Sequence, residues 1–368
     1  MQLPPFKLDH WLAKHSFATP PIAYDLASST GPKWTLQDFL ALGDGAGMED
    51  VVLGYAPSEG GRALRAAIGD FLDVDPDWVM VTLGASEALS VLLCTAARPG
   101  ANVVLPHPGY PAFDPMAGVW GLDVRHVRLS RQDGFRQRAA DMLKAVDDNT
   151  VLALVNSPHN PVGTVMPREE IEELAAALQR KGVPLVVDEV YHPLYFGHSP
   201  ASAAAIPNVI AMGDMSKALS LAGLRLGWLV VRDPARRAQM IDARSYFTIS
   251  SSPLLEELAV HAFASREAIL ARLQIPASEN LAALGRFMDR VSDILAWVKP
   301  DGGTVCFPWF RDGRDSRPFC EALAAQGVLV APGDCFGTPE HMRVGFALLA
   351  NDKFVEGFAI FERVLREQ

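Results

Sequence analysis

Residues 208–228 read NVIAMGDMSKALSLAGLRLGW, and this stretch joins an apolar run to two isolated cations. The run at 208–214 has the length and apolar character of a buried strand, and charged residues follow where it ends. Lysine is scarce in this chain, because only eight of its 33 basic residues are lysines. Lys217 and Arg225 therefore stand out among small apolar neighbours. The question is whether Lys217 is a solvated surface group or a nucleophile.

Similar apolar runs recur before this stretch and alternate with segments of helical periodicity. We predict strands at 78–82, 102–106, 123–129, 150–156, 183–190, 208–214 and 227–231. Continuous apolar strands separated by helices indicate a mostly parallel sheet covered on both faces. Ligands of such sheets bind beyond the carboxyl ends of the strands, so candidate site residues are sought there.

The pattern changes near residue 255, where two long helical stretches begin. Short strands are expected after them, near 297–300, 302–310, 327–333 and 341–347, and a helix closes the chain. We therefore predict three parts, which are an irregular N-terminal arm at 1–35, a large ligand-binding domain at 36–250 and a small α+β domain at 251–368. The arm is expected to pack with the small domain.

Composition limits the classes of function. The 368 residues are 49% apolar and 21% charged, as in soluble enzymes. The formal net charge of −10 argues against nucleic acid or an acidic membrane surface as a partner. No apolar run reaches the roughly 18 residues that span a bilayer, and the N-terminus lacks a secretory apolar region. The four cysteines have no CxxC spacing and the nine histidines no HxxxH or HExxH spacing. We therefore expect a cytoplasmic protein without a metal site.

Two predicted strand ends carry polar turns. Gly84, Ala85 and Ser86 open a helix after the strand at 78–82, and free backbone N–H groups at such a helix start can hold an anion. An ordinary serine cap would give the same pattern. Asn156 and Asn160 lie in the proline-rich turn NSPHNPVG after the strand at 150–156. Their side chains could equally bond their own backbone.

Two further strand ends complete a set that fits one cofactor. Asp188 comes after VPLVV in the strand predicted at 183–190 and Tyr191 follows this strand, while Lys217 and Arg225 follow the strand at 208–214. A buried carboxylate needs a charged or hydrogen-bonded partner, although a helix cap would supply one. Pyridoxal phosphate carries a phosphate, an aldehyde that reacts with lysine and a pyridine nitrogen that needs a carboxylate. The set as a whole favours this cofactor more than any residue does alone.

At this point the chain resembles the class I and II aminotransferases, which are fold-type-I pyridoxal phosphate enzymes. The resemblance runs from about Tyr55 to Gly345, in the order of the family. Its strongest segments are NSPHNPVG (156–163), VVDEVY (186–191), SKALSLAGLRLGW (216–228) and HMRVGFA (341–347). It implies an α/β fold in which a large cofactor domain holds a mostly parallel, seven-stranded sheet between helices, beside the small α+β domain.

The resemblance assigns a role to each matching position around the cofactor ring. Lys217 is the Schiff-base lysine and the base that moves the proton. Asp188 pairs with the pyridine nitrogen, Tyr191 and Asn160 bond the phenolic oxygen, and Tyr110 stacks on the ring. The phosphate is expected to lie among Gly84, Ala85, Ser86, Ser216 and Arg225.

The remaining roles concern the substrate and the partner subunit. Arg343 matches the arginine that binds the substrate α-carboxylate, with Asn160 and Ser29 beside the substrate. Tyr55 matches a tyrosine that reaches the phosphate of the neighbouring subunit, which implies a homodimer with shared active sites.

Two positions raise separate questions. The family commonly has serine or threonine where this chain has Asp214. At an effective dielectric near 20, two like charges about 4 Å apart cost roughly 4 kcal/mol. We therefore expect Asp214 to turn away from the phosphate, and either cap the turn at Ser216 and Lys217 or pair with Arg225. Arg244 could bind a second substrate carboxylate, but a surface arginine is the expectation.

The favoured function is transfer of an amino group between an amino acid and a 2-oxo acid. A lyase, a decarboxylase or a capreomycidine synthase-like cyclase could use the same scaffold, and GGTVCFPWF, YFTISSSPLLEE and DHWLAKH resemble the cyclase. The fate of the cofactor separates these reactions. A non-enzymatic regulator would carry an added DNA-binding module. The acidic charge of this chain, and an N-terminal arm that begins almost at the first residue, do not favour that alternative.

Overall fold

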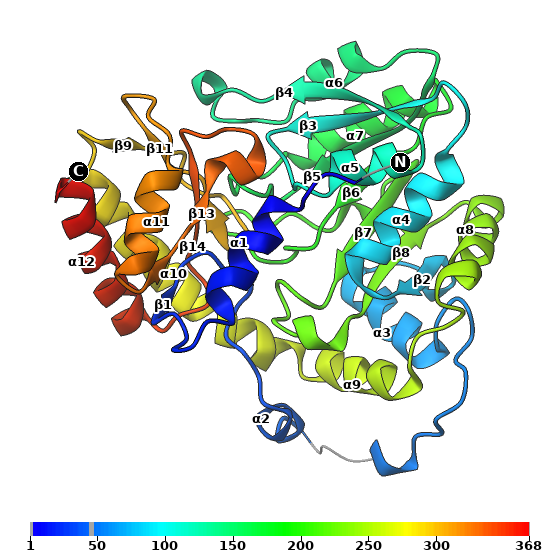
Figure 1. The fold of residues 1–368 in the computed structure, drawn as a ribbon. Helices are drawn as coiled ribbons and strands as arrows, with labels where there is room; N and C mark the ends of the chain where they lie inside the picture. The colour runs from blue at the N-terminus through cyan, green and yellow to red at the C-terminus, as the bar shows by residue number, and fades with distance from the viewer. Residues whose placement is uncertain (1–2, 44–47, 368) are drawn as a thin grey trace.

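Seven strands form one sheet at the centre of the molecule, with helices on both sides (Figure 1). The computed structural model describes residues 3–43 and 48–367. The strands lie in the order β2-β8-β7-β6-β5-β3-β4. Their bounds are β2 Val79–Thr82, β3 Asn102–His107, β4 Asp123–Arg128, β5 Thr150–Asn156, β6 Leu185–Asp188, β7 Val209–Asp214 and β8 Gly227–Val231.

Six of these strands run parallel, and β8 is antiparallel to its neighbours β2 and β7. The predicted mostly parallel sheet is confirmed. The strand predicted at 183–190 ends earlier, at Asp188. The chain turns there because Asp188 Oδ1 accepts a hydrogen bond from Val190 N at 3.1 Å, a local bond that competes with the ladder.

Both faces of the sheet are buried along every strand except the edge strand β4, which explains the continuous apolar runs of the other six. Successive residues of a strand point to opposite faces. Accordingly, Val155 and Val187 belong to one core cluster, while their neighbours Leu154 and Val186 belong to another. The helices of the first face are α3 Arg62–Leu72, α6 Ala139–Ala145, α7 Arg168–Gln179 and α9 Pro253–Ala264. Those of the second are α4 Gly84–Ala96, α5 Phe113–Val119 and α8 Pro234–Phe247.

The C-terminal part combines short strands with long helices, as predicted. Its helices are α10 Arg266–Arg290, α11 Arg317–Ala325 and α12 Asn351–Glu367. Its strands are β9 Leu295–Ala296, β10 Val305–Cys306, β11 Trp309–Phe310, β12 Val328–Leu329, β13 Ala331–Pro332 and β14 Met342–Gly345. The strand expected at 297–300 is wrong, because pairing with β11 involves only Leu295 and Ala296. Pro300, which has no N–H, cannot donate to a ladder.

The N-terminal arm is more regular than expected. Residues Lys7–Ser16 form helix α1, and Tyr24–Asp25 form strand β1, so the prediction of an irregular arm is wrong. The helix is stabilised by burial of Leu8 and Trp11, which share one face at i, i+3 spacing. Trp11 Nε1 donates to Val330 O at 2.9 Å, and β1 pairs in parallel with β12. The arm therefore contacts the C-terminal part (Figure 1). The domain limits at 36 and 251 stay a prediction.

No helix among residues 3–43 and 48–367 has the length and apolar character needed to cross a membrane.

Candidate active site

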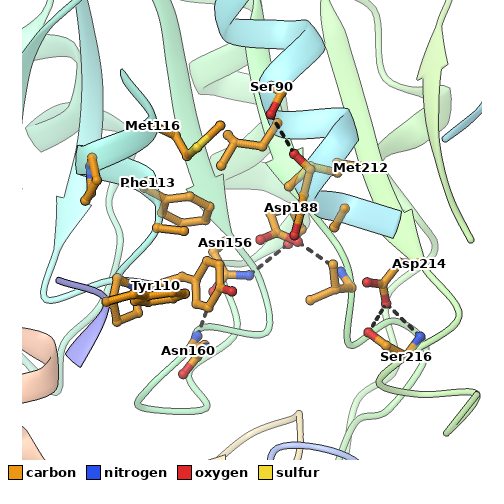
Figure 2. A pocket seen from close by; sticks show the side chains of 18 of the residues that line it. Ser90, Tyr110, Phe113, Met116, Asn156, Asn160, Asp188, Met212, Asp214 and Ser216 are labelled. Atoms are coloured by element: carbon orange, nitrogen blue, oxygen red, sulfur yellow. Dashed lines mark hydrogen bonds between the residues drawn. The ribbon is translucent and has the colours of Figure 1, made fainter. Parts of the chain in front are cut away.

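The carboxyl ends of the parallel strands open into one pocket with a cavity volume of about 620 Å³ (Figure 2). The ends of β5, β6 and β7 contribute Asn156, Asp188 and Asp214. Predicted site residues that line the pocket are Ala85, Ser86, Tyr110, Asn160, Asp188, Tyr191, Ser216, Lys217 and Arg225. The parallel sheet therefore places at one edge residues that lie more than 130 positions apart in the chain.

Four predicted residues lie outside the pocket lining. Ser29 hydrogen-bonds to Lys217 and Arg343 to Asn160, and both partners line the pocket. Gly84 packs against the guanidinium of Arg225. Tyr55 does not reach the pocket of its own chain, because its side chain is 83% exposed in the segment before α3. Its predicted role in a partner's site stays a prediction.

Lys217 is a partly buried amine at the centre of this group. Its Nζ donates a hydrogen bond to Ser29 Oγ at 2.9 Å. Desolvation lowers the pKa of Lys217, although Asp214 acts in the opposite direction. A lowered pKa increases the share of neutral amine, which is the nucleophilic form. The alternative of a solvated surface lysine does not describe this residue.

Asp188 is a buried carboxyl group at the end of β6. Burial raises its pKa to about 7, and the nearby carboxylates of Asp214 and Glu189 contribute to the same effect. A positively charged ring nitrogen placed beside Asp188 would favour the ionised carboxylate. Asn156 holds the adjacent loop, because its Nδ2 donates to Asp188 O at 3.1 Å and its Oδ1 accepts from Asn160 N at 2.6 Å.

Two buried polar atoms of the site have no hydrogen-bond partner within the described residues, namely Tyr191 Oη and Arg343 Nε. Burial of such atoms is costly unless a ligand satisfies them. The Arg343 guanidinium is already oriented, because Nη2 donates to Ala27 O at 2.9 Å and Nη1 to Asn160 Oδ1 at 3.4 Å. A phenolic oxygen near Tyr191 and a carboxylate near Arg343 would satisfy these two atoms.

The start of helix α4 provides a cradle for an anion. Gly84 has φ +77°, and a Cβ at this position would lie 2.9 Å from Arg225 Nη2. Only glycine therefore lets the guanidinium approach the helix start so closely. Ala85 and Ser86 follow in the first turn, where backbone N–H groups are free to bind a phosphate.

Asp214 caps the turn of Lys217. Its Oδ1 accepts hydrogen bonds from Ser216 N at 2.8 Å and from Ser216 Oγ at 2.6 Å, as Figure 2 shows. The expected cap is therefore present, whereas the alternative pairing with Arg225 is not among the described ion pairs. Both donors of Ser216 are thus engaged by Asp214, so in this arrangement Ser216 has no donor left for the phosphate that it was predicted to bind.

The expectation of a surface arginine at position 244 is wrong. Arg244 is 0% exposed, and its Nε lies 3.3 Å from Glu87 Oε2. Arg244 Nη2 also donates to Ser251 Oγ at 3.2 Å. Helix α8 packs against α4 here, and the guanidinium satisfies groups at that contact rather than facing a second substrate carboxylate.

Several lining residues escaped the sequence reasoning. The arm contributes Leu3, Pro4, Pro5, Phe6 and Lys7, and the rest of the chain adds Phe113, Met116 and Cys335. Phe6 meets Tyr110 edge to face, with ring centroids 6.3 Å apart, and Tyr110 meets Phe113 in the same way at 5.5 Å. The arm's apolar start was visible in the sequence, but its position over the pocket depends on long-range packing.

Lys217, Asp188, Ala85 and Ser86 line one pocket, and the buried Arg343 lies beside it. An amine, a buried carboxylate, a helix start and a guanidinium suit the groups of pyridoxal phosphate and its substrate. The chain belongs to the aminotransferase class I and II family, whose profile matches residues 24–356. Pyridoxal phosphate is thus the cofactor, and the orphaned Tyr191 Oη, the Gly84 cradle and the donor set all fit it. The predicted family, fold, enzyme class and cofactor are confirmed.

Particular relatives carry different activities. A capreomycidine synthase of Streptomyces vinaceus is 32% identical and aligns with 94% of this chain and 90% of that protein. A valine–pyruvate aminotransferase of Mycobacterium tuberculosis is 33% identical, over 80% of this chain and 79% of that protein. A solved pyridoxal phosphate-dependent aminotransferase from Streptococcus suis has a TM-score of 0.91 at 26% identity, covering 100% of this chain and 99% of that one.

Proposed function

We propose that this enzyme transfers the amino group of an amino acid to a 2-oxo acid, with Lys217 as its reacting amine. The observation that carries the proposal is the hydrogen bond of Lys217 Nζ to Ser29 Oγ, in the pocket that also contains Asp188. When bound, pyridoxal phosphate supplies an aldehyde that condenses with amines and a ring that accepts the electron pair of a broken Cα–H bond.

The substrate carboxylate is assigned to Arg343. Its Nε is buried without a partner among the described residues, while Nη1 and Nη2 are held by Asn160 and Ala27. A guanidinium fixed in this way presents a preformed donor to a carboxylate. Binding there orients the Cα–H bond toward Lys217, and a near-attack geometry of this kind lowers the entropic barrier.

Lys217 Nζ then acts as the base that removes the Cα proton and returns a proton in the second half of the reaction. Burial lowers the pKa of Lys217, which favours the neutral amine, and the neutral amine is the form that accepts a proton. Ser29 Oγ holds Nζ when the amine is free. With the cofactor bound, Asp188 would keep the pyridine nitrogen protonated, and Tyr191 Oη and Asn160 would donate hydrogen bonds to the phenolic oxygen.

A second candidate is cyclisation of an amino acid on the same cofactor. It is favoured by the capreomycidine synthase relative, which aligns with 94% of this chain. Both reactions would use Lys217 and Arg343 for the same proton removal. They differ in whether the amino group stays with the cofactor when the first product leaves, as it does in transamination, or leaves with the product, as it does in cyclisation.

A single-turnover experiment separates the two. The loaded enzyme is mixed with one amino acid at a time, without a 2-oxo acid, and products are measured by mass spectrometry. Transamination yields one equivalent of 2-oxo acid per cofactor and then stops, with the amino group on the cofactor. A cyclic amino acid formed over many turnovers, without 2-oxo acid, would replace the first proposal with the second.

We also propose a homodimer in which Tyr55 completes the partner's phosphate site. The support is its 83% exposure on a segment tied by Ser58 O to Arg244, beside the α4 cradle. A cytoplasmic location is proposed from the four cysteines, which are all free thiols.

A further inference from the structure

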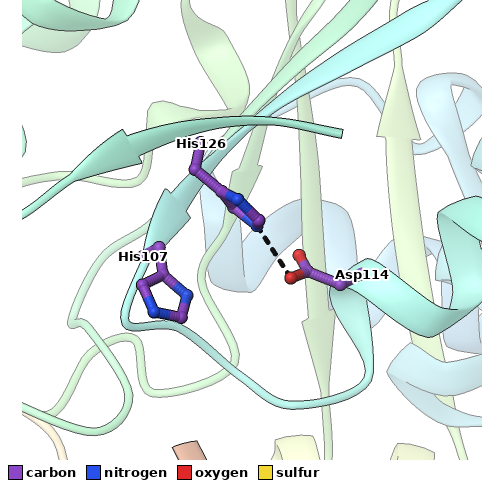
Figure 3. A group of neighbouring side chains, drawn as sticks. All are labelled: His107, Asp114 and His126. Atoms are coloured by element: carbon purple, nitrogen blue, oxygen red, sulfur yellow. Dashed lines mark hydrogen bonds and ion pairs between the residues drawn. The ribbon is translucent and has the colours of Figure 1, made fainter. Parts of the chain in front are cut away.

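We propose that His107, His126 and Asp114 form a binding site for a divalent transition-metal ion such as Zn²⁺. One potential ligand atom from each residue lies within 4.8 Å of the other two. Figure 3 shows His126 pointing at Asp114, with His107 beside them. The site is separate from the pocket described above, because none of the three residues lines it.

The three side chains come from different elements. His107 ends strand β3, His126 lies on the neighbouring strand β4, and Asp114 is in the first turn of helix α5. Backbone pairing of β3 with β4 fixes the two histidine positions relative to each other. Sites on paired strands and a helix are held more precisely than sites on loops, which favours metal binding. Sequence spacing could not show it, because 19 positions separate the histidines.

The ligands are chemically available. Metal binding needs the neutral imidazole, which is the ordinary form of a histidine side chain at neutral pH. Among the residues that the structure describes, no hydrogen bond engages the His107 ring. The ring packs instead near Gly337, where an added Cβ would lie 3.1 Å from His107 Cε1. His126 and Asp114 have side chains that are 33% and 46% exposed, so an ion has access from solvent.

Only small rearrangements are needed. His126 Nε2 lies 2.7 Å from Asp114 Oδ2. Ligands of a tetrahedral zinc ion are roughly 3.3 Å apart, as its bond lengths of about 2.0 to 2.2 Å require. Exposed side chains can open that contact and close the gap to His107 by χ rotation. The positive charge of Arg128, near His107, disfavours a bound metal cation, and the negative charge of the Asp114 carboxylate offsets this repulsion. Two imidazoles and one carboxylate suit Zn²⁺ better than Ca²⁺ or Mg²⁺.

The position gives the ion a consequence for the pocket. His107 and Asp114 lie at the two ends of the segment that carries Tyr110, the residue assigned to stack on the cofactor ring. An ion bound by both would tie this segment to strand β4. We therefore expect Zn²⁺ to act as a structural clasp that holds Tyr110 in place.

Isothermal titration of the cofactor-loaded enzyme with ZnCl₂ in phosphate-free buffer tests the site. Wild type should bind one Zn²⁺ per chain, and His126→Asn and Asp114→Asn should each weaken binding at least tenfold. The His126 side chain is 33% exposed, so folding is expected to survive His126→Asn, and the unfolding midpoint of this variant without zinc checks this. The exposed His198→Asn is the matched control and should bind Zn²⁺ like wild type.

Hydrogen exchange locates the ion. Zn²⁺ should slow exchange of backbone amides in the segment 109–114 of wild type, and not in His126→Asn. Zinc affinity that is undetectable in wild type, or equal in wild type and His126→Asn, would overturn the proposal. Binding that protects only other segments would do the same, because it would place the ion at the cofactor or at a cysteine.

Discussion

Arg244 Nε and Glu87 Oε2 form an ion pair 3.3 Å long that is closed off from solvent. The pair connects three segments, because Glu87 Oε2 also accepts from Leu83 N at 2.6 Å and Ser58 O accepts from Arg244 Nη1. Glu87 lies in the first turn of α4, directly after Gly84, Ala85 and Ser86, which are proposed to hold the phosphate. The pair therefore holds the residue before helix α4, Leu83, and it also holds the segment that contains Ser58 and Tyr55.

Arg244→Met should destabilise the protein. Removing one partner of a buried ion pair leaves the other charge uncompensated, which costs about 3 to 5 kcal/mol. The free energy of unfolding, measured with denaturant on the cofactor-free protein, checks this. Arg286→Met, at an exposed position of helix α10, is the matched control and should change stability by roughly 0.5 kcal/mol or less. A loss at position 244 no larger than the control's would contradict a buried pair.

Asp188→Asn should separate stability from activity. The folded-state pKa of Asp188 is about 7, well above that of a free aspartate, so the folded state keeps its proton in between. Stability from this group is complete below about pH 4 and is lost as the pH rises to 7. The cofactor-free variant should therefore be more stable than wild type by up to about 4 kcal/mol at pH 8, and by less at pH 5. Unfolding curves at both pH values test this sign.

The same variant should lose several orders of magnitude in turnover, because an amide cannot keep the pyridine nitrogen protonated. The amide oxygen introduced at position 188 would still accept from Val190 N, so packing is expected to survive. Retention of a third of wild-type turnover would show that Asp188 does not face the ring nitrogen.

Lys217→Ala should abolish turnover while some cofactor remains bound without a covalent link. Borohydride reduction of the wild type, followed by peptide mapping, should place the cofactor on Lys217. Lys181→Ala, at an exposed position, serves as control and should keep both the label and the turnover. A label on any of the other seven lysines would refute the assignment.

Tyr55→Phe mixed with Lys217→Ala tests the shared active site. Each variant alone should have low activity, and hybrid dimers should contain one site with both residues intact. Partial recovery of turnover on mixing is therefore expected. A monomer by light scattering, or no recovery from two variants that exchange subunits, would end the dimer proposal.

Asp214→Ser should bind pyridoxal phosphate as well as wild type or better. The serine can replace one of the two hydrogen bonds that Asp214 makes to Ser216, and it removes a negative charge near the phosphate. The cofactor dissociation constant of both proteins, at fixed pH and ionic strength, is the measurement. A tenfold weaker constant in the variant would show that the carboxylate makes a favourable contact beyond this cap.

The sequence by itself determined the central sheet and the polar residues at the strand ends that line the pocket. Buried strands such as 150–156 are continuous apolar runs, and parallel strands bring their carboxyl ends to one edge whatever the details of packing. Asp188, Asn160 and Lys217 could therefore be located from strand ends alone. Local signals sufficed because each residue follows its strand within a few positions.

Only the tertiary structure decided which groups meet across long distances in the chain. Arg244 has the sequence surroundings of an exposed arginine, and its burial depends on Glu87, 157 positions away. Helix α1 gains stability from contacts with strand β13, which no pattern within residues 1–35 reveals. His107, Asp114 and His126 likewise converge through strand pairing. Such contacts are determined by the packing free energy between segments that lie far apart in the sequence. The local propensity of any one segment does not reveal them.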